Sequence, residues 1–287
     1  MKISFKNLLI VFLSAFFIFL LVNKKENTYK NLDELEITYI DVGQGNAVLV
    51  KTKDKSLLID GGNRANSRYY YTYIKNKNLK KIDYMIASHY DEDHIAGLIS
   101  ILKNYDVDKI LCPDYKKNTK IYNSFTRSLN NSKAEIIHPK QGDDFNLGKA
   151  KVKFLWPKEY ENDKDNDNSI VVKIIYGNMS FLFPADASKN VEDQLIYSAY
   201  NLKSDVYMLA HHGSKFSNSK EFLKEVNPKL AIISVGKNNR YNHPSNSLVN
   251  SLNNSNIKIL RTDKDGDIKI KCDGNKIKIS TNKNNKK

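Results

Sequence analysis

Four potential metal ligands lie close together in the sequence, at His89, Asp91, Asp93 and His94. They follow an apolar segment at 82–87 that is typical of a strand, and they precede a segment typical of a helix start. Polar side chains are costly to bury without partners, so this density at one strand end indicates a chemical site. Imidazole and carboxylate together suit zinc, manganese or iron. The pattern therefore predicts a metal centre.

Further residues of these types follow other predicted strands, at Asp186, His211, His212 and His243. A carboxylate can bridge two cations roughly 3.5–4 Å apart, and such pairs clamp the attacking and leaving oxygens of a displacement. A bound metal ion also lowers the pKa of water to about 7. If these strand ends meet, the chemistry they predict is hydrolysis at neutral pH.

Asp60 ends another predicted strand and directly precedes two glycines. Two interpretations fit this position: a turn cap, or a carboxylate that orients a metal ligand from beneath. Gly43 and Gly45 lie in an earlier turn, but their spacing does not match a phosphate-binding loop. A hairpin turn is the favoured interpretation of that segment.

Composition allows a large folded domain, since 40% of the 287 residues are hydrophobic. The formal net charge of +14 favours polyanionic partners such as nucleic acid, teichoic acid or a lipid surface, although no single basic stripe stands out. The two cysteines lie far apart, which excludes a disulfide framework and a zinc knuckle. The sequence does not specify an oligomeric state.

The N-terminal segment contains an apolar run at 8–22 with lysines on both sides. Spanning a bilayer takes about 20 residues, and the run reaches this length if Lys6 extends towards the headgroups. No small-residue cleavage pattern follows. We expect residues 1–34 to form an uncleaved signal-anchor and tether, with one domain at 35–282 outside the cell membrane. The alternative is a cleaved signal and a secreted protein.

Strand and helix patterns alternate along the rest of the chain, with hairpins at both ends. Helices are predicted at 69–81 and 188–200, and a hairpin joins strands at 169–176 and 179–183. Residues 263–267 predict a tight turn between two strands. This order fits two mixed sheets packed face to face and covered by helices.

The pattern His89-x-Asp91-x-Asp93-His94 resembles the metal signature of the metallo-β-lactamase superfamily. With six other motifs in order, residues 36–275 closely resemble the hydrolase domain of the ComEC DNA-uptake (competence) family. The resemblance implies an α/β (α+β) fold, a four-layer αββα sandwich with the site along one edge of the two sheets. The six motifs are Asp41-Val-Gly-Gln-Gly45, Leu58-Ile-Asp-Gly-Gly62, Phe183-Pro-Ala-Asp186, His211-His-Gly-Ser214, Arg240-Tyr-Asn-His-Pro244 and Arg261-Thr-Asp-Lys-Asp-Gly266.

The resemblance implies one or two divalent metal ions, zinc or manganese. It assigns His89 and Asp91 to one metal position, and Asp186 bridges the two positions. The ligands of the other position are Asp93, His94 and one histidine of the pair at 211–212. We prefer His211, because it directly follows the predicted strand, and expect His212, Asp60 and Asp41 to support the ligands.

The resemblance also places three residues near the substrate. His243 is implied as a proton donor or oxyanion partner, while Arg240 and Asn238 are possible phosphate contacts. Asp93 is expected to serve in catalysis as well as in metal binding.

The chain departs from the superfamily pattern around the first metal position. Histidine is commoner where Asp91 stands, and Trp156-Pro157 occupies the stretch where a further histidine is usual. His138 is a distant candidate for that ligand. The first position is therefore expected to be harder in character and closer to a manganese site.

These features predict a metal-dependent hydrolase, most simply a phosphodiesterase or nuclease that acts on DNA or another polyanion outside the membrane. One alternative is a non-catalytic surface module that binds DNA or wall polymer. Another is a hydrolase of a phosphorylcholine ester, a lactone or a β-lactam. A single anchor cannot conduct DNA, so the transport role of the ComEC channel is not expected of this chain.

Overall fold

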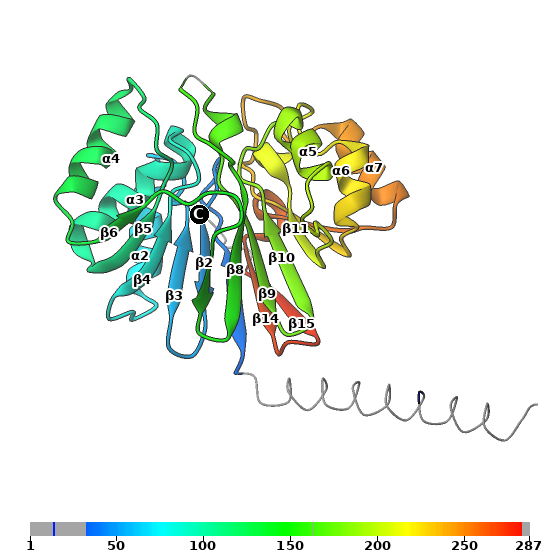
Figure 1. Ribbon diagram of the computed structural model, residues 1–287, viewed down its shortest axis with the longest axis horizontal. Coiled ribbons are helices and arrows are strands. Elements are labelled where there is room, and N and C mark those ends of the chain that lie inside the picture. The colour runs from blue at the N-terminus through cyan, green and yellow to red at the C-terminus, as the bar shows by residue number, and fades with distance from the viewer. Residues whose placement is uncertain (1–13, 15–32, 163, 283–287) are drawn as a thin grey trace, which may run out of the picture.

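A computed structural model gives the fold, and it describes residue 14 and residues 33–162 and 164–282 (Figure 1). Apart from Ser14, the apolar run at 8–22 lies outside the described residues, so the signal-anchor stays a prediction. Among the residues that are described, no helix has the length and apolar character needed to cross a bilayer.

Two mixed sheets form the centre of the fold. The first sheet has eight strands in the order β15-β14-β1-β2-β3-β4-β5-β6, and its β3 to β6 are mutually parallel. Its strands are β1 (Leu35–Tyr39), β2 (Val48–Lys51), β3 (Ser56–Ile59), β4 (Ile82–Ile86), β5 (Val107–Leu111), β6 (Glu135–Ile137), β14 (Asp267–Cys272) and β15 (Ile277–Asn282).

The second sheet has seven strands in the order β13-β12-β11-β10-β9-β8-β7, and its β10 to β13 are parallel. Its strands are β7 (Asp144–Leu147), β8 (Ala150–Trp156), β9 (Val171–Tyr176), β10 (Met179–Phe183), β11 (Val206–Met208), β12 (Leu230–Ile233) and β13 (Lys258–Arg261).

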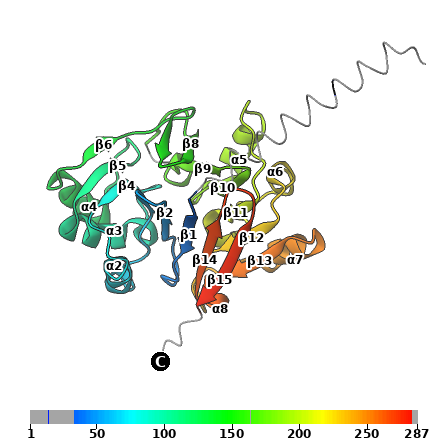
Figure 2. The same cartoon turned by 90° about the horizontal axis from the view of Figure 1, so that it is seen from below.

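Helices cover the outer face of each sheet, which completes a four-layer αββα arrangement (Figures 1 and 2). The helices on the first sheet are α2 (Ser67–Lys75), α3 (Glu92–Asn104) and α4 (Lys120–Asn130). Those on the second are α5 (Lys189–Ile196), α6 (Lys220–Val226) and α7 (Asn246–Asn254). The remaining short helices are η1 (Asn166–Asn168), η2 (Ala210–Gly213) and α8 (Thr262–Asp265).

Three apolar layers hold these elements together. Phe181 and Phe183 of β10 join the core between the two sheets, while Leu182 between them packs into the core under the helices. This alternation follows from the two-residue period of a strand, whose successive side chains point to opposite faces. A third cluster joins the first sheet to its own helices and includes Leu58 of β3 and Ile101 of α3.

The predicted hairpin is confirmed as β9 and β10, but three local predictions differ from the structure. The helix predicted at 188–200 is α5, which ends at Ile196. The helix predicted at 69–81 ends at Lys75, and Asn78 adopts a left-handed backbone with φ of 52°. The turn predicted at 263–267 is instead the short helix α8. Here the Asp265 carboxylate accepts a hydrogen bond from the Arg261 N–H at 2.8 Å, and this local bond closes the turn as a helix.

We predict that Phe181→Ala destabilises the chain by about 3–5 kcal/mol, because it opens a cavity between the two sheets. Phe181 is fully buried, whereas Phe216 is 68% exposed and provides a matched control. Phe216→Ala should change the free energy of unfolding by less than about 0.5 kcal/mol. Urea unfolding measures both values, and equal losses would contradict the assigned core.

Candidate metal centre

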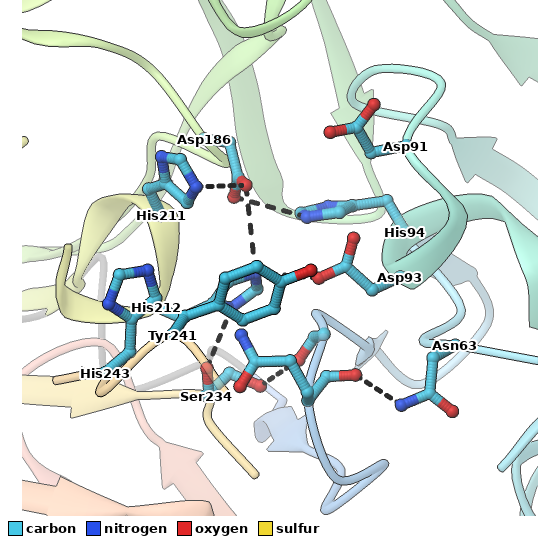
Figure 3. A network of polar contacts seen from close by, with 12 residues as sticks. Asn63, Asp91, Asp93, His94, Asp186, His211, His212, Ser234, Tyr241 and His243 are labelled. Atoms are coloured by element: carbon cyan, nitrogen blue, oxygen red, sulfur yellow. Dashed lines mark hydrogen bonds and ion pairs between the residues drawn. The ribbon is translucent and has the colours of Figure 1, made fainter. Parts of the chain in front are cut away.

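The candidate site lies where parallel strands of both sheets end. Asp60 and His89 follow β3 and β4 of the first sheet, and Asp186 and His212 follow β10 and β11 of the second. Because the carboxyl ends of parallel strands meet at one edge of a sheet, residues distant in sequence converge there. Figure 3 shows the ligand-type side chains from the two sheets pointing towards one another.

The Asp186 carboxylate is the centre of the cluster and is almost fully buried. Its Oδ1 lies 3.2 Å from His94 Nε2. Its Oδ2 lies 3.9, 3.6 and 3.7 Å from the Nε2 atoms of His89, His211 and His212. Burial alone would raise the pKa of Asp186, but His94 and His212 hold it well below the ordinary value. The carboxylate therefore stays ionised among the imidazoles.

The side chains form two groups, and within each group the potential ligand atoms all lie within 4.8 Å of one another. One contains His89, His94 and Asp186, and the other contains Asp93, His94 and His212. The sequence analysis preferred His211 for the second group, but the structure puts His212 there, with its Nε2 3.2 Å from Asp93 Oδ2.

The backbone explains this difference between the two histidines. β11 ends at Met208, and both histidines adopt left-handed conformations within η2. This turn buries the His212 ring against the cluster and leaves 29% of the His211 side chain exposed on the other side of Asp186. The number of residues between a histidine and the end of its strand does not predict such a turn.

Several buried donor and acceptor atoms of this cluster have no hydrogen-bond partner among the described residues. They are His89 Nε2, His94 Nε2, His212 Nε2 and Asp186 Oδ1. Two of the imidazole nitrogens lie 3.2 Å from a carboxylate oxygen, His94 Nε2 from Asp186 and His212 Nε2 from Asp93, but these contacts are ion pairs without hydrogen-bond geometry. The lone pairs and charge of the cluster therefore remain available to a bound ligand. Imidazole nitrogens and carboxylate oxygens are ligands for divalent metal ions, and the donor set fits such ions.

Hydrogen bonds beneath the ligands fix the imidazole rings. Asp60 Oδ2 accepts from His94 Nδ1 at 2.8 Å. Asp60 also accepts two hydrogen bonds from Ser88, from its N–H to Oδ1 and from its hydroxyl to Oδ2, each at 2.8 Å. His212 Nδ1 lies 2.9 Å from the Ser234 carbonyl oxygen. In both histidines Nδ1 is thus engaged, which turns Nε2 towards Asp186. Asp60 lies where the sequence analysis expects an orienting carboxylate.

The glycine-rich loop after β1 packs directly against the start of α3. The Asn46 N–H donates to the Asp93 carbonyl oxygen at 3.1 Å, and the Ser234 hydroxyl donates to the Gly45 carbonyl at 2.7 Å. A Cβ on Gly45, whose φ is 128°, would lie only 2.3 Å from the Asp93 oxygen. Asp41 serves this same loop, because its carboxylate accepts from the Gly43 N–H at 3.1 Å.

A buried polar network holds the segment that carries the two histidines. The Asn218 side chain accepts from the Ala210 N–H and donates to the Ala210 carbonyl, each at 2.9 Å. The buried Glu192 carboxylate in turn accepts from the N–H groups of Asn218 and Ser219. Asn218 thus ties down the start of the segment at Ala210, and Glu192 of α5 holds Asn218 in place, so the network supports the left-handed turn of the histidines.

Asp91 belongs to a more exposed part of the site than Asp93. Its Oδ2 lies 3.7 Å from His89 Nε2, while its Oδ1 binds the Lys117 ammonium. Lys117 also contacts Asp165 at 2.5 Å. The sequence gives no signal for the contacts of Lys117 with Asp91 and Asp165. No local pattern links the three residues, which come from separate loops.

His243 and its neighbours form the outer wall of the site. The His243 ring lies 5.6 Å from the His211 ring and stacks on Tyr241 at 5.7 Å. Burial, followed by repulsion from His211 and His212, lowers the pKa of His243 to about 4. At neutral pH the ring is therefore uncharged, so it can donate an N–H hydrogen bond but is a poor source of a proton. The lowered pKa of His243 favours the oxyanion role over the proton-donor role.

Three other predicted residues occupy different places. Arg240 lines a hollow of about 550 Å³ together with Asp91 and Asp93, and its Nη2 donates to the Tyr241 hydroxyl at 2.6 Å. Asn238 lines a neighbouring hollow on the far side of Tyr241. His138 Nδ1 lies 2.8 Å from the Cys112 carbonyl oxygen, and neither ligand group contains His138.

We predict that Gly45→Ala displaces Asp93 and weakens metal binding by about 10–100-fold. The expected cost in unfolding free energy is about 2 kcal/mol, since the new Cβ meets backbone atoms. Gly142→Ala is a matched control, because its φ is also positive but its nearest neighbour is the flexible end of Tyr200. Calorimetric metal titration checks the affinity, and equal effects of the two variants would contradict the proposed packing.

We predict that Lys117→Met strengthens metal binding at the position of His89 and Asp91 by roughly tenfold, because a competing ammonium is removed from the carboxylate. Titration of the metal-depleted chain with Mn²⁺ measures both affinity and stoichiometry. The exposed neighbour Lys116 provides the control variant Lys116→Met. Weaker binding in Lys117→Met than in this control would refute the competition.

Comparison with known proteins places this geometry in a family. Residues 40–237 match the model of the metallo-β-lactamase superfamily. ComE operon protein 3 of Bacillus subtilis (strain 168) is 29% identical over 256 residues, which cover 83% of this chain and 33% of that protein. Competence protein ComA of Neisseria gonorrhoeae is 33% identical over 239 residues, which cover 82% and 32%. The chain thus spans about a third of the length of these curated relatives.

A solved structure agrees at the level of the fold. Igni18, a metallo hydrolase from the archaeon Ignicoccus hospitalis, superposes with a TM-score of 0.55 at 16% identity over 82% of this chain and 98% of that one. The matched residues 40–237 contain both candidate ligand groups, which lie where strands of the two sheets end. The chain therefore belongs to the metallo-β-lactamase superfamily, with a hydrolase fold that implies divalent metal ions.

Proposed function

We propose that this protein is a metal-dependent phosphodiesterase that cleaves DNA. The observation that carries the proposal is the convergence of three buried imidazole nitrogens on the Asp186 carboxylate, without hydrogen bonds, next to an open hollow of about 550 Å³. Arg240 lines this hollow together with Asp91 and Asp93. A cation beside a dinuclear-type ligand set suits a substrate whose reacting centre carries negative charge.

Divalent metal ions, when bound, would supply an activated water and neutralise charge that develops on the phosphate oxygens. Asp186 and the imidazoles would hold the ions, while Asp60 and the Ser234 carbonyl keep two of the rings in place. Arg240 would bind a non-bridging phosphate oxygen, and the neutral His243 would donate an N–H hydrogen bond to a developing oxyanion.

DNA is favoured as the substrate class by two independent observations. The similar protein of Neisseria gonorrhoeae is named a competence protein, and the motifs of this chain resemble the ComEC DNA-uptake family. The net charge of +14 also favours association with a polyanion. We further propose that residues 1–34 anchor the domain at 35–282 to the outer side of the cell membrane, since the sequence pattern of the run favours this arrangement.

We predict that the purified chain contains zinc or manganese and hydrolyses bis(4-nitrophenyl) phosphate and DNA. Asp186→Asn and Asp93→Ala should each lower turnover by at least about 100-fold while the chain stays folded, because each removes an anionic ligand. Elemental analysis, turnover and circular dichroism give the three measurements. Asp108→Asn changes a carboxylate that pairs with Lys81, and it serves as the control.

The same assays separate this proposal from its alternatives. Turnover of nitrocefin or of a phosphorylcholine ester, without turnover of DNA, would assign a different hydrolase substrate. If the chain never binds metal, and the Asp93 and Asp186 variants hold DNA as well as the parent does, the protein is a binding module and the phosphodiesterase proposal fails.

A further inference from the structure

We propose that a groove leading away from the metal centre binds single-stranded nucleic acid by stacking its bases on Tyr241 and Phe216. This inference rests on the proposed function, because it assigns the path of the substrate beside the same site. It adds a chemical requirement, namely unpaired bases on one side of the cleaved phosphate.

Three adjoining hollows make up the groove. The hollow that contains Asp91 and Asp93 shares Asn239 and Tyr241 with a second hollow of about 620 Å³. The second hollow shares Lys215 and Phe216 with a third of about 310 Å³. Each boundary between hollows therefore carries one aromatic side chain, and the row begins at the candidate metal ligands.

Both aromatic side chains are unusually exposed. Phe216 is 68% exposed and Tyr241 is 49% exposed, and they are two of the four large hydrophobic side chains exposed among the described residues. Both line the hollows that lead away from the candidate metal ligands, where a ligand with flat apolar faces could cover them. Figure 3 shows the Tyr241 ring beside His243 and in front of Asp93, with which it lines the first hollow.

A cation accompanies each ring. The Arg240 guanidinium lies 4.8 Å from the centre of the Tyr241 ring, and Lys215 Nζ lies 5.0 Å from the centre of the Phe216 ring. Surfaces that bind single strands combine these two elements, because aromatic faces stack any base while cations bind the backbone between them. The pairing recurs at both boundaries of the groove.

The first hollow is lined by the acidic residues Asp91, Glu92 and Asp93 at the candidate metal centre, whereas the second and third hollows carry the positive charge that a phosphate backbone requires. Exposed lysines line the second and third hollows, and the carboxylate of Asp263 is engaged by two hydrogen bonds from Arg261 at 2.9 and 2.7 Å. Glu221 is the other acidic residue of these two hollows. The lysines are Lys189, Lys215, Lys220 and Lys237.

Unpaired bases explain the aromatic side chains better than other polyanions do. A teichoic acid or a polyphosphate would bind the lysines but has no π-face to cover Tyr241 and Phe216. In a duplex the bases are paired and stacked on one another, so their faces are not available to side chains. A single strand satisfies both the cations and the rings.

The test is binding of fluorescent oligothymidylate by the full chain in the presence of a chelator, compared with an abasic strand of the same length. Fluorescence anisotropy should show about tenfold tighter binding of the strand that carries bases. Phe216→Ala and Tyr241→Ala should each remove most of this difference and leave binding of the abasic strand within about twofold. Tyr197 is 89% exposed and does not line the three hollows, so Tyr197→Ala should leave the difference intact.

Equal affinity for the two strands would overturn the stacking groove, as would aromatic variants that behave like the Tyr197 variant. Equal competition by polyphosphate in all variants would identify a general polyanion surface instead. Since the chelator prevents hydrolysis, this measurement does not depend on turnover. The binding assay can therefore contradict the stacking groove while phosphodiesterase activity is observed. It can also support the groove when no such activity is found.

Discussion

One buried carboxylate organises the functional end of this molecule. Asp186 lies almost without solvent contact, within 3.9 Å of imidazole nitrogens from four histidines. An ionised group in such a position is strongly destabilising unless charge or hydrogen bonds compensate it. The imidazoles compensate the charge through ion pairs, and the Nε2 atoms of three of them make no hydrogen bond among the described residues. The cluster thus offers a donor set for divalent ions, which the family's fold implies.

The two-sheet architecture makes this arrangement attainable. Face-packed sheets lie about 10 Å apart, which is close enough for side chains from both sheet edges to reach a common volume. His89 and His94 come from the first sheet and the helix after it, whereas Asp186 and His212 come from the second. The positions of the ligands relative to one another therefore depend on the apolar core between the sheets, and the glycine-rich loop and the Asn218 network add local precision at the start of α3 and at η2.

The sequence predicts much of this, and the failures have clear physical causes. The order of strand ends that carry histidine and aspartate was enough to predict the layers and the ligand types. It could not tell His212 from His211, because the choice depends on two successive left-handed residues that tertiary contacts stabilise. It also missed Lys117, since an ion pair between remote loops leaves no periodic or local signal. The length of α2 was overestimated for a related reason: weak helix formers such as Asn76 and Asn78 end a helix only in their local context.

The two parts of the candidate site differ in rigidity and in exposure. Asp93, His94 and His212 are held from behind by backbone contacts or by carboxylate and carbonyl acceptors, and Asp93 is the more buried of the two aspartates. The Asp91 side chain is 37% exposed, and it pairs with the ammonium group of Lys117, a long side chain from a separate loop. A catalytic metal site needs a rigid set of ligands and an open position, and these requirements conflict if every ligand is equally buried. Here the fold assigns rigidity to the inner position and access to the outer one, and the hollow lined by Asp91, Asp93 and Arg240 opens on the accessible side.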